Sequence, residues 1–273
     1  MISLPVRLSE FGSVFVVFPP ESSQEADRIV KITHDGSIIT TDIGSKIQIS
    51  RKDGKFENLI FLSGQYTLQT ADSKKIKIEI AKLPEPLNIT GPWDVKFAPN
   101  WGAPAHVQFP ELTSWSEHPD RGVRYFSGKA TYHKKIRVST DMLKKDRLLF
   151  LDLGEVEVIA IVKLNGKDLG ILWKKPFRLD ITRAAHEGEN SLELTVVNLW
   201  PNRLIGDANL PEDCTWTNGG ELKEYPQWLL DDKPSPTGRF TFSIIKAWSK
   251  DDTLRKSGLI GPVVLYAVAK VVT

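Results

Sequence analysis

The stretch NLWPNRLIGD, residues 198–207, places an amide, a guanidinium and a carboxylate next to an indole ring. It follows SLELTVV (191–197), whose alternating apolar and polar residues predict a strand. A turn after a strand needs only Pro201 and Asn202. The arginine and the aspartate that follow must therefore have another task, either structural or functional.

For Arg203 we expect a fixed pairing with a carboxylate, and Asp207 is the nearest one in sequence. A planar guanidinium suits such a pairing because it presents its donors in a rigid fork. A carbonyl of a partner domain and direct contact with a sugar are the alternatives. In the same interpretation Trp200 closes one end of a β-sandwich.

Aromatic side chains gather in the segments between the predicted strands, beside Asn, Asp, Glu and Arg. An indole can cover the apolar C–H face of a sugar while polar side chains bind its hydroxyls. The alternative is that these rings plug the ends of a sandwich, and Trp93 and Trp173, next to strand signals, are assigned to the core. The candidate carbohydrate-binding residues are Trp101, Trp115, Trp200, Asn202, Arg203, Asp207, Trp216 and Tyr225.

Hydrolysis of a glycosidic bond would need two carboxylates, roughly 5 Å or 6.5–9.5 Å apart. Acids in the aromatic-rich loops are the candidates for such a pair, although each of them is also explained as a loop acid: Glu111, Asp120, Asp207, Glu212 and Asp213. The sequence has no H-E-x-x-H, G-x-S-x-G or P-loop motif. We interpret Cys214, the one cysteine, as a small, partly buried residue.

Strand-like runs dominate the chain. Turn dipeptides at Asp35-Gly36, Asp53-Gly54 and Asn165-Gly166 predict three hairpins, because both residues of a type I′ turn take positive φ. Further predicted strands lie at 13–18, 64–70, 75–81, 93–97, 129–138, 147–156, 191–197, 239–248 and 261–271.

Two short helical turns are predicted, one after Thr140 and one between Asp180 and Gly188. Many short strands with little helix indicate an all-β protein, and exclude a (β/α)₈ barrel. Three prolines near residue 86 predict a boundary there. We expect a small antiparallel β-sandwich-like domain over 1–85 and a jelly-roll β-sandwich over 86–273.

The bulk composition excludes several classes of function. The chain has 273 residues, with 36 basic and 34 acidic side chains and a formal net charge of +2, so no basic field draws it to nucleic acid. Its apolar runs fall short of the ~20 residues needed to cross a bilayer. The N-terminus has no basic segment followed by an apolar one, so no signal peptide is predicted.

Several segments resemble a known family. Residues 101–136 and 151–182, the latter with the Asn-Gly hairpin, resemble the galactose-binding-like jelly roll of family 2-type glycoside hydrolases. HEGENSLELTVVNLWPNRLIGD (186–207) and SGLIGPVVL (257–265) resemble the C-terminal end of glycoside hydrolase family 106, the α-L-rhamnosidases of bacteria that degrade plant polysaccharides. EFGSVFVVF (10–18) resembles the segment that follows the catalytic barrel in the same enzymes.

The resemblance implies an accessory region without catalytic residues, because the family's catalytic carboxylates belong to an upstream (β/α)₈ barrel. The implied partners are a plant-type glycan or a glycoside hydrolase catalytic domain, and the implied location is periplasmic or extracellular. Such folds often carry a structural Ca²⁺, which backbone carbonyls would partly hold here. A stand-alone hydrolase and a protein-interaction β-sandwich are the competing hypotheses.

Overall fold

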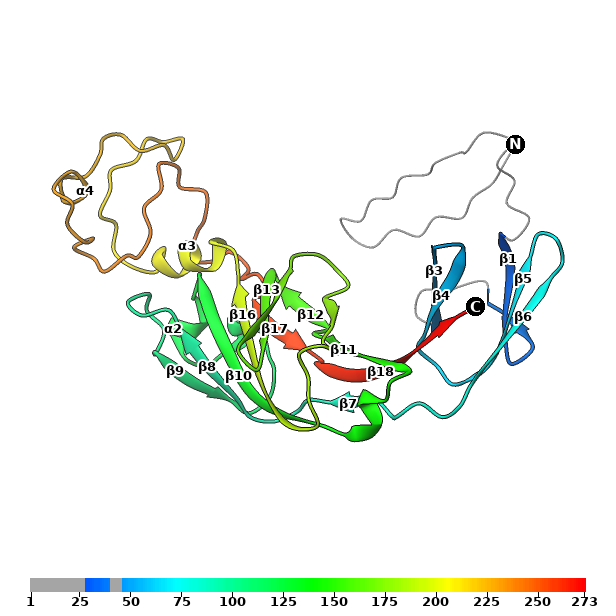
Figure 1. The fold of residues 1–273 in the computed structure, drawn as a ribbon. Helices are drawn as coiled ribbons and strands as arrows, with labels where there is room; N and C mark the ends of the chain where they lie inside the picture. The colour runs from blue at the N-terminus through cyan, green and yellow to red at the C-terminus, as the bar shows by residue number, and fades with distance from the viewer. Residues whose placement is uncertain (1–27, 40–45) are drawn as a thin grey trace, which may run out of the picture.

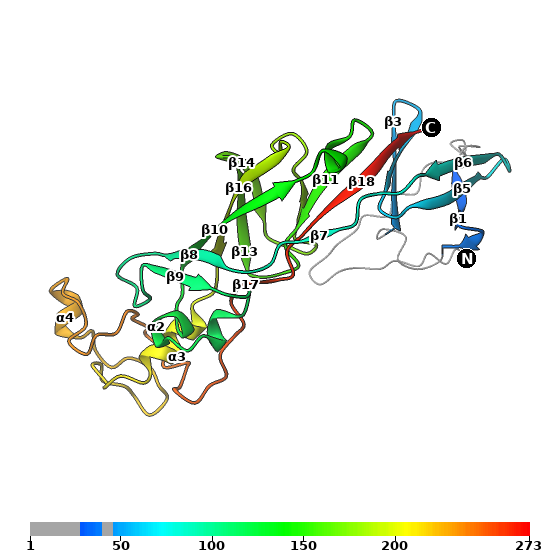
Figure 2. The same cartoon turned by 90° about the horizontal axis from the view of Figure 1, so that it is seen from below.

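The computed structural model describes residues 28–39 and 46–273. The strand predicted for 13–18 and the segment 10–18, on which part of the family resemblance rests, lie outside the described residues. Two β-rich parts follow one another in space, with a long loop region at the far end of the second (Figures 1 and 2). The fold is all-β, as predicted, with a sandwich and a jelly-roll domain.

The first part contains a four-stranded sheet in the order β2-β1-β5-β6. Its strands are β1 (Ile29–His34), β2 (Ser37–Ile38), β5 (Gly64–Thr70) and β6 (Lys75–Ile80). A small hydrophobic cluster lies under it, built around Ile47, Ile60, Tyr66, Leu68 and Ile78. The alternation of buried and exposed side chains along β5 follows from the period-two pattern of its sequence.

Two larger sheets form the jelly roll, and the second of them continues into the first part through β4 and β3. One has the order β14-β13-β16-β10-β8-β9: β8 (Trp93–Phe97), β9 (His106–Phe109), β10 (Lys129–Val138), β13 (Ile159–Leu164), β14 (Lys167–Leu172) and β16 (Gly188–Val197). The other has the order β15-β11-β18-β4-β3, with β7 beside β18: β3 (Ile47–Lys52), β4 (Lys55–Ile60), β7 (Leu87–Asn88), β11 (Arg147–Asp152), β15 (Arg178–Asp180) and β18 (Val264–Val272). A short pair completes the set: β12 (Glu155–Glu157) and β17 (Gly258–Gly261).

Strand β18 connects the two parts of the molecule. Its first half pairs with β11, from Val264 opposite Asp152 to Ala269 opposite Arg147, and its end pairs with β4 of the first part. Figure 1 shows this red strand running from the jelly roll into the first part. The boundary expected near residue 86 stays a prediction.

The three hairpin predictions are confirmed. Asp35 and Gly36 have φ of 49° and 80°, Asp53 and Gly54 have 50° and 75°, and Asn165 and Gly166 have 52° and 76°. These values are those of a type I′ turn, which matches the twist of the flanking strands.

Other local predictions were wrong. Residues 239–248 form no strand, and no helix follows Asp180, whose carboxylate instead accepts a hydrogen bond from the Thr182 amide at 2.8 Å. The helical turn predicted at Thr140 is present as η3 (Thr140–Leu143), a 3-10 helix, but its N-cap is Ser139 and not Thr140. Trp93 is fully buried as predicted, whereas Trp173 is 65% exposed, so its assignment to the core was wrong.

Within residues 86–273, four helical segments were not predicted. They are short and lie in the loops at one end of the jelly roll: η2 (Trp115–Glu117), α2 (Arg121–Arg124), α3 (Pro201–Asp207) and α4 (Gln227–Leu230). We call residues 208–257, which include α4, the loop lobe. The loop lobe and the other three helical segments together form the region that holds the candidate site (Figures 1 and 2).

Candidate functional site

Helix α3 contains the residues singled out from the sequence. Pro201 begins the helix, where a proline is favourable because the first turn needs no hydrogen bond from its nitrogen. Asn202 therefore lies within a helix and not in the expected turn. The pairing of Arg203 with Asp207 is present, with Nη2 and Oδ1 2.9 Å apart and side chains only 7% and 2% exposed. Burial lowers the pKa of Arg203, and the adjacent carboxylate of Asp207 opposes that shift.

Asp207 also holds the loop lobe against the helix. Its Oδ2 accepts hydrogen bonds from the amides of Phe240 and Thr241, at 2.9 and 2.8 Å, and from the Thr241 hydroxyl at 2.8 Å. The guanidinium of Arg203 lies 4.9 Å from the centre of the Phe240 ring. The Arg203–Asp207 pair thus braces a loop, which is the structural role expected for it.

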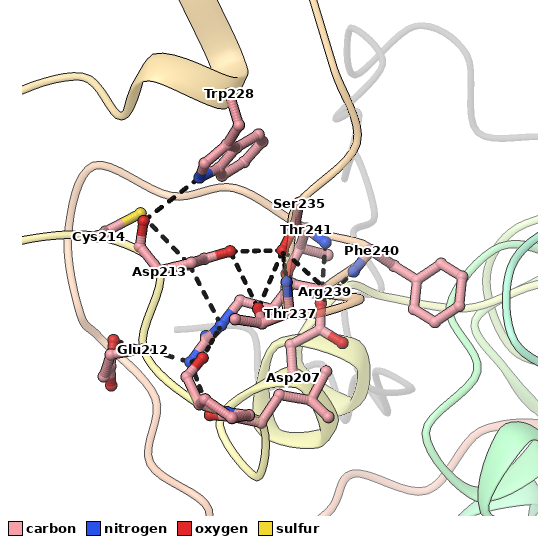
Figure 3. Close-up of polar contacts among 12 residues, drawn as sticks. Asp207, Glu212, Asp213, Cys214, Trp228, Ser235, Thr237, Arg239, Phe240 and Thr241 are labelled. Atoms are coloured by element: carbon pink, nitrogen blue, oxygen red, sulfur yellow. Dashed lines mark hydrogen bonds and ion pairs between the residues drawn. The ribbon is translucent and has the colours of Figure 1, made fainter.

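A second buried carboxylate organises the interior of the lobe (Figure 3). Asp213 accepts hydrogen bonds from the hydroxyls of Ser235 and Thr237, and its Oδ1 lies 3.4 Å from Nε of Arg239. Arg239 also donates to the carbonyls of Leu210 and Pro211. Side chains and carbonyls from two separated segments, 210–213 and 235–239, therefore meet around one aspartate.

Glu212 and Cys214 flank this aspartate. Burial acts to raise the pKa of Glu212, but hydrogen bonds from Lys246 and from the Trp216 indole outweigh it, so the pKa is lowered. Burial, with the nearby charge of Asp213, raises the pKa of Cys214 to about 11. The thiol is therefore protonated at neutral pH and is no activated nucleophile, in line with the structural interpretation of Cys214.

Two cavities lie beside this network. The first has a volume of about 290 Å³ and is lined by residues that include Glu212, Trp216, Arg239, Lys246 and Trp248. The second, of about 380 Å³, lies where residues 198–202 meet the segment 255–257. Trp248 lines both cavities.

Aromatic rings also gather on the surface of this end. Trp101 lies edge-on to Trp200 at 5.9 Å between ring centres and is stacked with Phe240 at 6.3 Å. Trp200 is 55% exposed, so it does not seal the end of the sandwich as expected. Tyr225, 58% exposed, packs against Phe242.

The predicted binding residues therefore fall into two groups. Trp115 is fully buried in the core, and its indole donates to the Tyr132 hydroxyl at 2.6 Å, so it cannot offer a face to a sugar. Asn202, Arg203 and Asp207 are also buried and stabilise loops. The aromatic candidates with accessible surface are Trp101, Trp200, Trp216 and Tyr225.

Sequence reasoning missed Trp248, Phe240 and Arg255. Trp248 and Phe240 lie in the run RFTFSIIKAW, whose alternation was interpreted as a strand. In this run aromatic residues lie close to basic ones, and this pattern is the signal that could have identified them as candidate site residues.

Across residues 28–39 and 46–273, no three His, Cys, Asp or Glu side chains gather to hold a metal ion. A calcium site formed partly by carbonyls stays a prediction. No helix of the described chain is long and apolar enough to span a membrane.

Comparison with known proteins relates the chain to glycoside hydrolases. No protein-family model matches it. A curated relative from Formosa agariphila, named "Putative beta-glucuronidase", is 45% identical over 219 residues, which cover 80% of this chain and 19% of the relative.

Two solved structures are similar to parts of this chain. A rhamnosidase from Novosphingobium sp. PP1Y matches 86% of this chain and 24% of its own, with a TM-score of 0.54 and 26% identity. A β-glucuronidase from an uncultured Clostridium sp. covers 68% of this chain and 29% of its own, with a TM-score of 0.42 and 24% identity. The chain spans about a fifth of the curated relative and about a quarter of the rhamnosidase.

Proposed function

We propose that this chain is a non-catalytic accessory region of a bacterial α-L-rhamnosidase-like glycoside hydrolase, of the C-terminal type found in family 106. It supports the catalytic domain or binds a plant glycan, in the periplasm or outside the cell. The observation that carries the proposal is the match to the rhamnosidase, which takes in 86% of this chain but 24% of that enzyme.

Several of the candidate acids form hydrogen bonds and ion pairs within the chain, and these contacts support a structural role for them. Asp207 and Asp213 are held by amides, hydroxyls and guanidinium groups, and Glu212 by Lys246 and Trp216. Asp120 caps α2 by accepting a hydrogen bond from the Val123 amide at 3.1 Å. A general acid or nucleophile must instead present its carboxyl group to the substrate.

Exposed aromatic rings support the binding role. Trp200 and Tyr225 each leave more than half of their surface accessible at the same end of the jelly roll. Such rings contribute to binding by covering the apolar face of a sugar. Loops carried by a rigid β-sandwich are a frequent place for binding residues.

Isothermal titration and a glycan array with rhamnose-containing pectins test the binding role. We expect Trp200→Ala to weaken binding and Trp173→Ala, at a tryptophan that is 65% exposed and lies next to edge strand β14, to leave it unchanged. A flat response across all sugars would remove the binding role and leave only support of a catalytic domain.

One observation favours a second function, docking of another protein. Ile171, in edge strand β14, and Trp173, one residue past its end, are 59% and 65% exposed, and Ile171 is opposite Ile161 of β13. Exposed apolar patches of this kind mark interaction surfaces when they are large enough. Size-exclusion chromatography with light scattering tests self-association, and a clean monomer at all concentrations would weigh against it.

A further inference from the structure

The second cavity lies between α3 and the segment that leads into β17. Its volume of about 380 Å³ falls in the range of small-molecule sites, ~300–1,000 Å³. Leu199, Pro201 and Trp248 supply apolar lining, and Arg255 and Lys256 supply positive charge. Figures 1 and 2 both show α3 next to the orange segment that approaches β17.

The buried side chain of Asn202 holds the backbone of Arg255 in the wall of this cavity. The Arg255 amide donates to Oδ1 of Asn202 at 2.7 Å, and the Arg255 carbonyl accepts from Nδ2 of Asn202 at 2.7 Å. Asn202 is 1% exposed and also donates to the Ser257 hydroxyl at 3.1 Å. These bonds hold the backbone of Arg255 in one position, so its side chain starts from a rigid base.

The guanidinium of Arg255 differs from the ammonium of Lys256, the other cation that lines the second cavity. Lys256 pairs with Glu155, Lys246 with Glu212, and Arg239 with Asp213. Arg255 lies 6.0 Å from the centre of the Trp248 ring and makes no ion pair with a carboxylate anywhere in the described chain. Glu157, which also lines the cavity, has an interaction of its own.

From this geometry we propose that the second cavity is a binding subsite for an acidic sugar. The carboxylate of the sugar pairs with the guanidinium of Arg255, and its C–H face packs on the apolar surface of Trp248 and Leu199. A planar guanidinium binds a planar carboxylate through two parallel hydrogen bonds, and such charge-assisted pairs are about twice as strong as neutral ones. The inference rests on the proposed function and adds a class of ligand to it.

The test is a titration of the purified chain with D-glucuronate, D-glucose and acetate, followed by calorimetry and saturation-transfer NMR. We expect glucuronate to bind at least tenfold more tightly than glucose or acetate, because only it engages both the ring and the guanidinium. Higher salt should reduce this preference, since the cavity is open to solvent.

Substitutions locate the effect. Arg255→Gln should remove the preference for glucuronate, and Trp248→Ala should weaken both sugars. Arg137→Gln makes the same change of charge at an exposed arginine on β10 and should leave all three titrations unchanged. Circular dichroism of each variant checks that the fold is intact.

Three results would overturn the inference: equal binding of glucose and glucuronate, glucuronate binding that survives Arg255→Gln, or binding of acetate as tight as that of glucuronate. If neutral pectic sugars still bind under any of these results, the proposed function stands and only the acidic subsite fails. If none of the sugars binds, both the subsite and the glycan-binding role are removed.

Discussion

The jelly-roll core and the loop lobe are stabilised by different physical means. The core is a continuous apolar cluster in which Trp93, Trp115, Leu151 and Leu194 are fully buried between paired strands. The loop lobe, all of whose residues are described, has only isolated bridges such as Glu221 with Ile245 in place of strands.

Two carboxylates stabilise the lobe, whereas the burial of apolar side chains stabilises the core. Asp207 fixes the backbone at Phe240 and Thr241, and Asp213 gathers Ser235, Thr237 and Arg239. A core spreads its stabilisation over many small contacts, whereas the lobe concentrates it in a few polar groups.

The largest effect is expected in the core. Trp115→Ala should lower the free energy of unfolding by about 3–5 kcal/mol, because it leaves a cavity and removes one of the two hydrogen-bond donors to the Tyr132 hydroxyl. Urea denaturation followed by circular dichroism measures it. Trp173→Ala, at a 65% exposed ring, should change stability by roughly 0.5 kcal/mol or less. Similar losses for the two variants would contradict the assignment of Trp115 to the core.

Asp207→Asn should cost about 3 kcal/mol, because it leaves the buried guanidinium of Arg203 without its counter-charge. Hydrogen exchange should rise at residues 240–241 and in α3. Asp251→Asn, an exposed acid in the same lobe, is the control and should change neither quantity. Unchanged exchange at 240–241 would mean that Asp207 does not anchor the lobe.

Asp213→Asn should have a smaller and local effect, about 1–3 kcal/mol, since hydroxyl hydrogen bonds and one ion pair weaken within the lobe. Exchange and proteolysis should increase in residues 208–241, while the unfolding of the core, followed by circular dichroism, stays where it was. A shift of the core transition as large as that of Trp115→Ala would show that lobe and core unfold as one unit.

The smallest effect concerns the thiol of Cys214. Its pKa, raised to about 11 from an ordinary 9.0, leaves about 100-fold less thiolate at pH 8 than an unperturbed thiol has. Alkylation by iodoacetamide should therefore be slow in the native chain and fast after unfolding, and Asp213→Asn should accelerate it. Equal rates in the native and unfolded chain would contradict the burial of this thiol.

The same shift has a defined sign for stability. The folded state keeps the thiol protonated, so its contribution to stability is fully present below pH 9 and is lost as the pH rises toward 11. Urea titrations between pH 8 and 11, compared with Cys214→Ser, measure this contribution. A stability that rises over this range relative to the variant would reverse the assigned direction.

The two regions also differ in how far the sequence predicts them. Hairpins such as the one at Asn165-Gly166 are predicted because their turn residues and strand alternation are local signals. The segment 239–248 has the same alternation but pairs only at the isolated bridge of Ile245 with Glu221, and the amides of Phe240 and Thr241 bond to Asp207 instead. The sequence predicts the Arg203–Asp207 pair because Asp207 is the carboxylate nearest to Arg203 in the chain, but it does not reveal this distant amide contact.

Whether any carboxylate of this chain breaks a glycosidic bond is tested most directly by hydrolysis. The purified chain would be incubated with nitrophenyl α-L-rhamnoside, nitrophenyl β-D-glucuronide and pectin, alongside Glu111→Gln and Glu212→Gln. We predict release no faster than in buffer for the parent chain and both variants. Turnover by the parent chain that disappears in either variant would contradict the assignment of this chain as a non-catalytic accessory region.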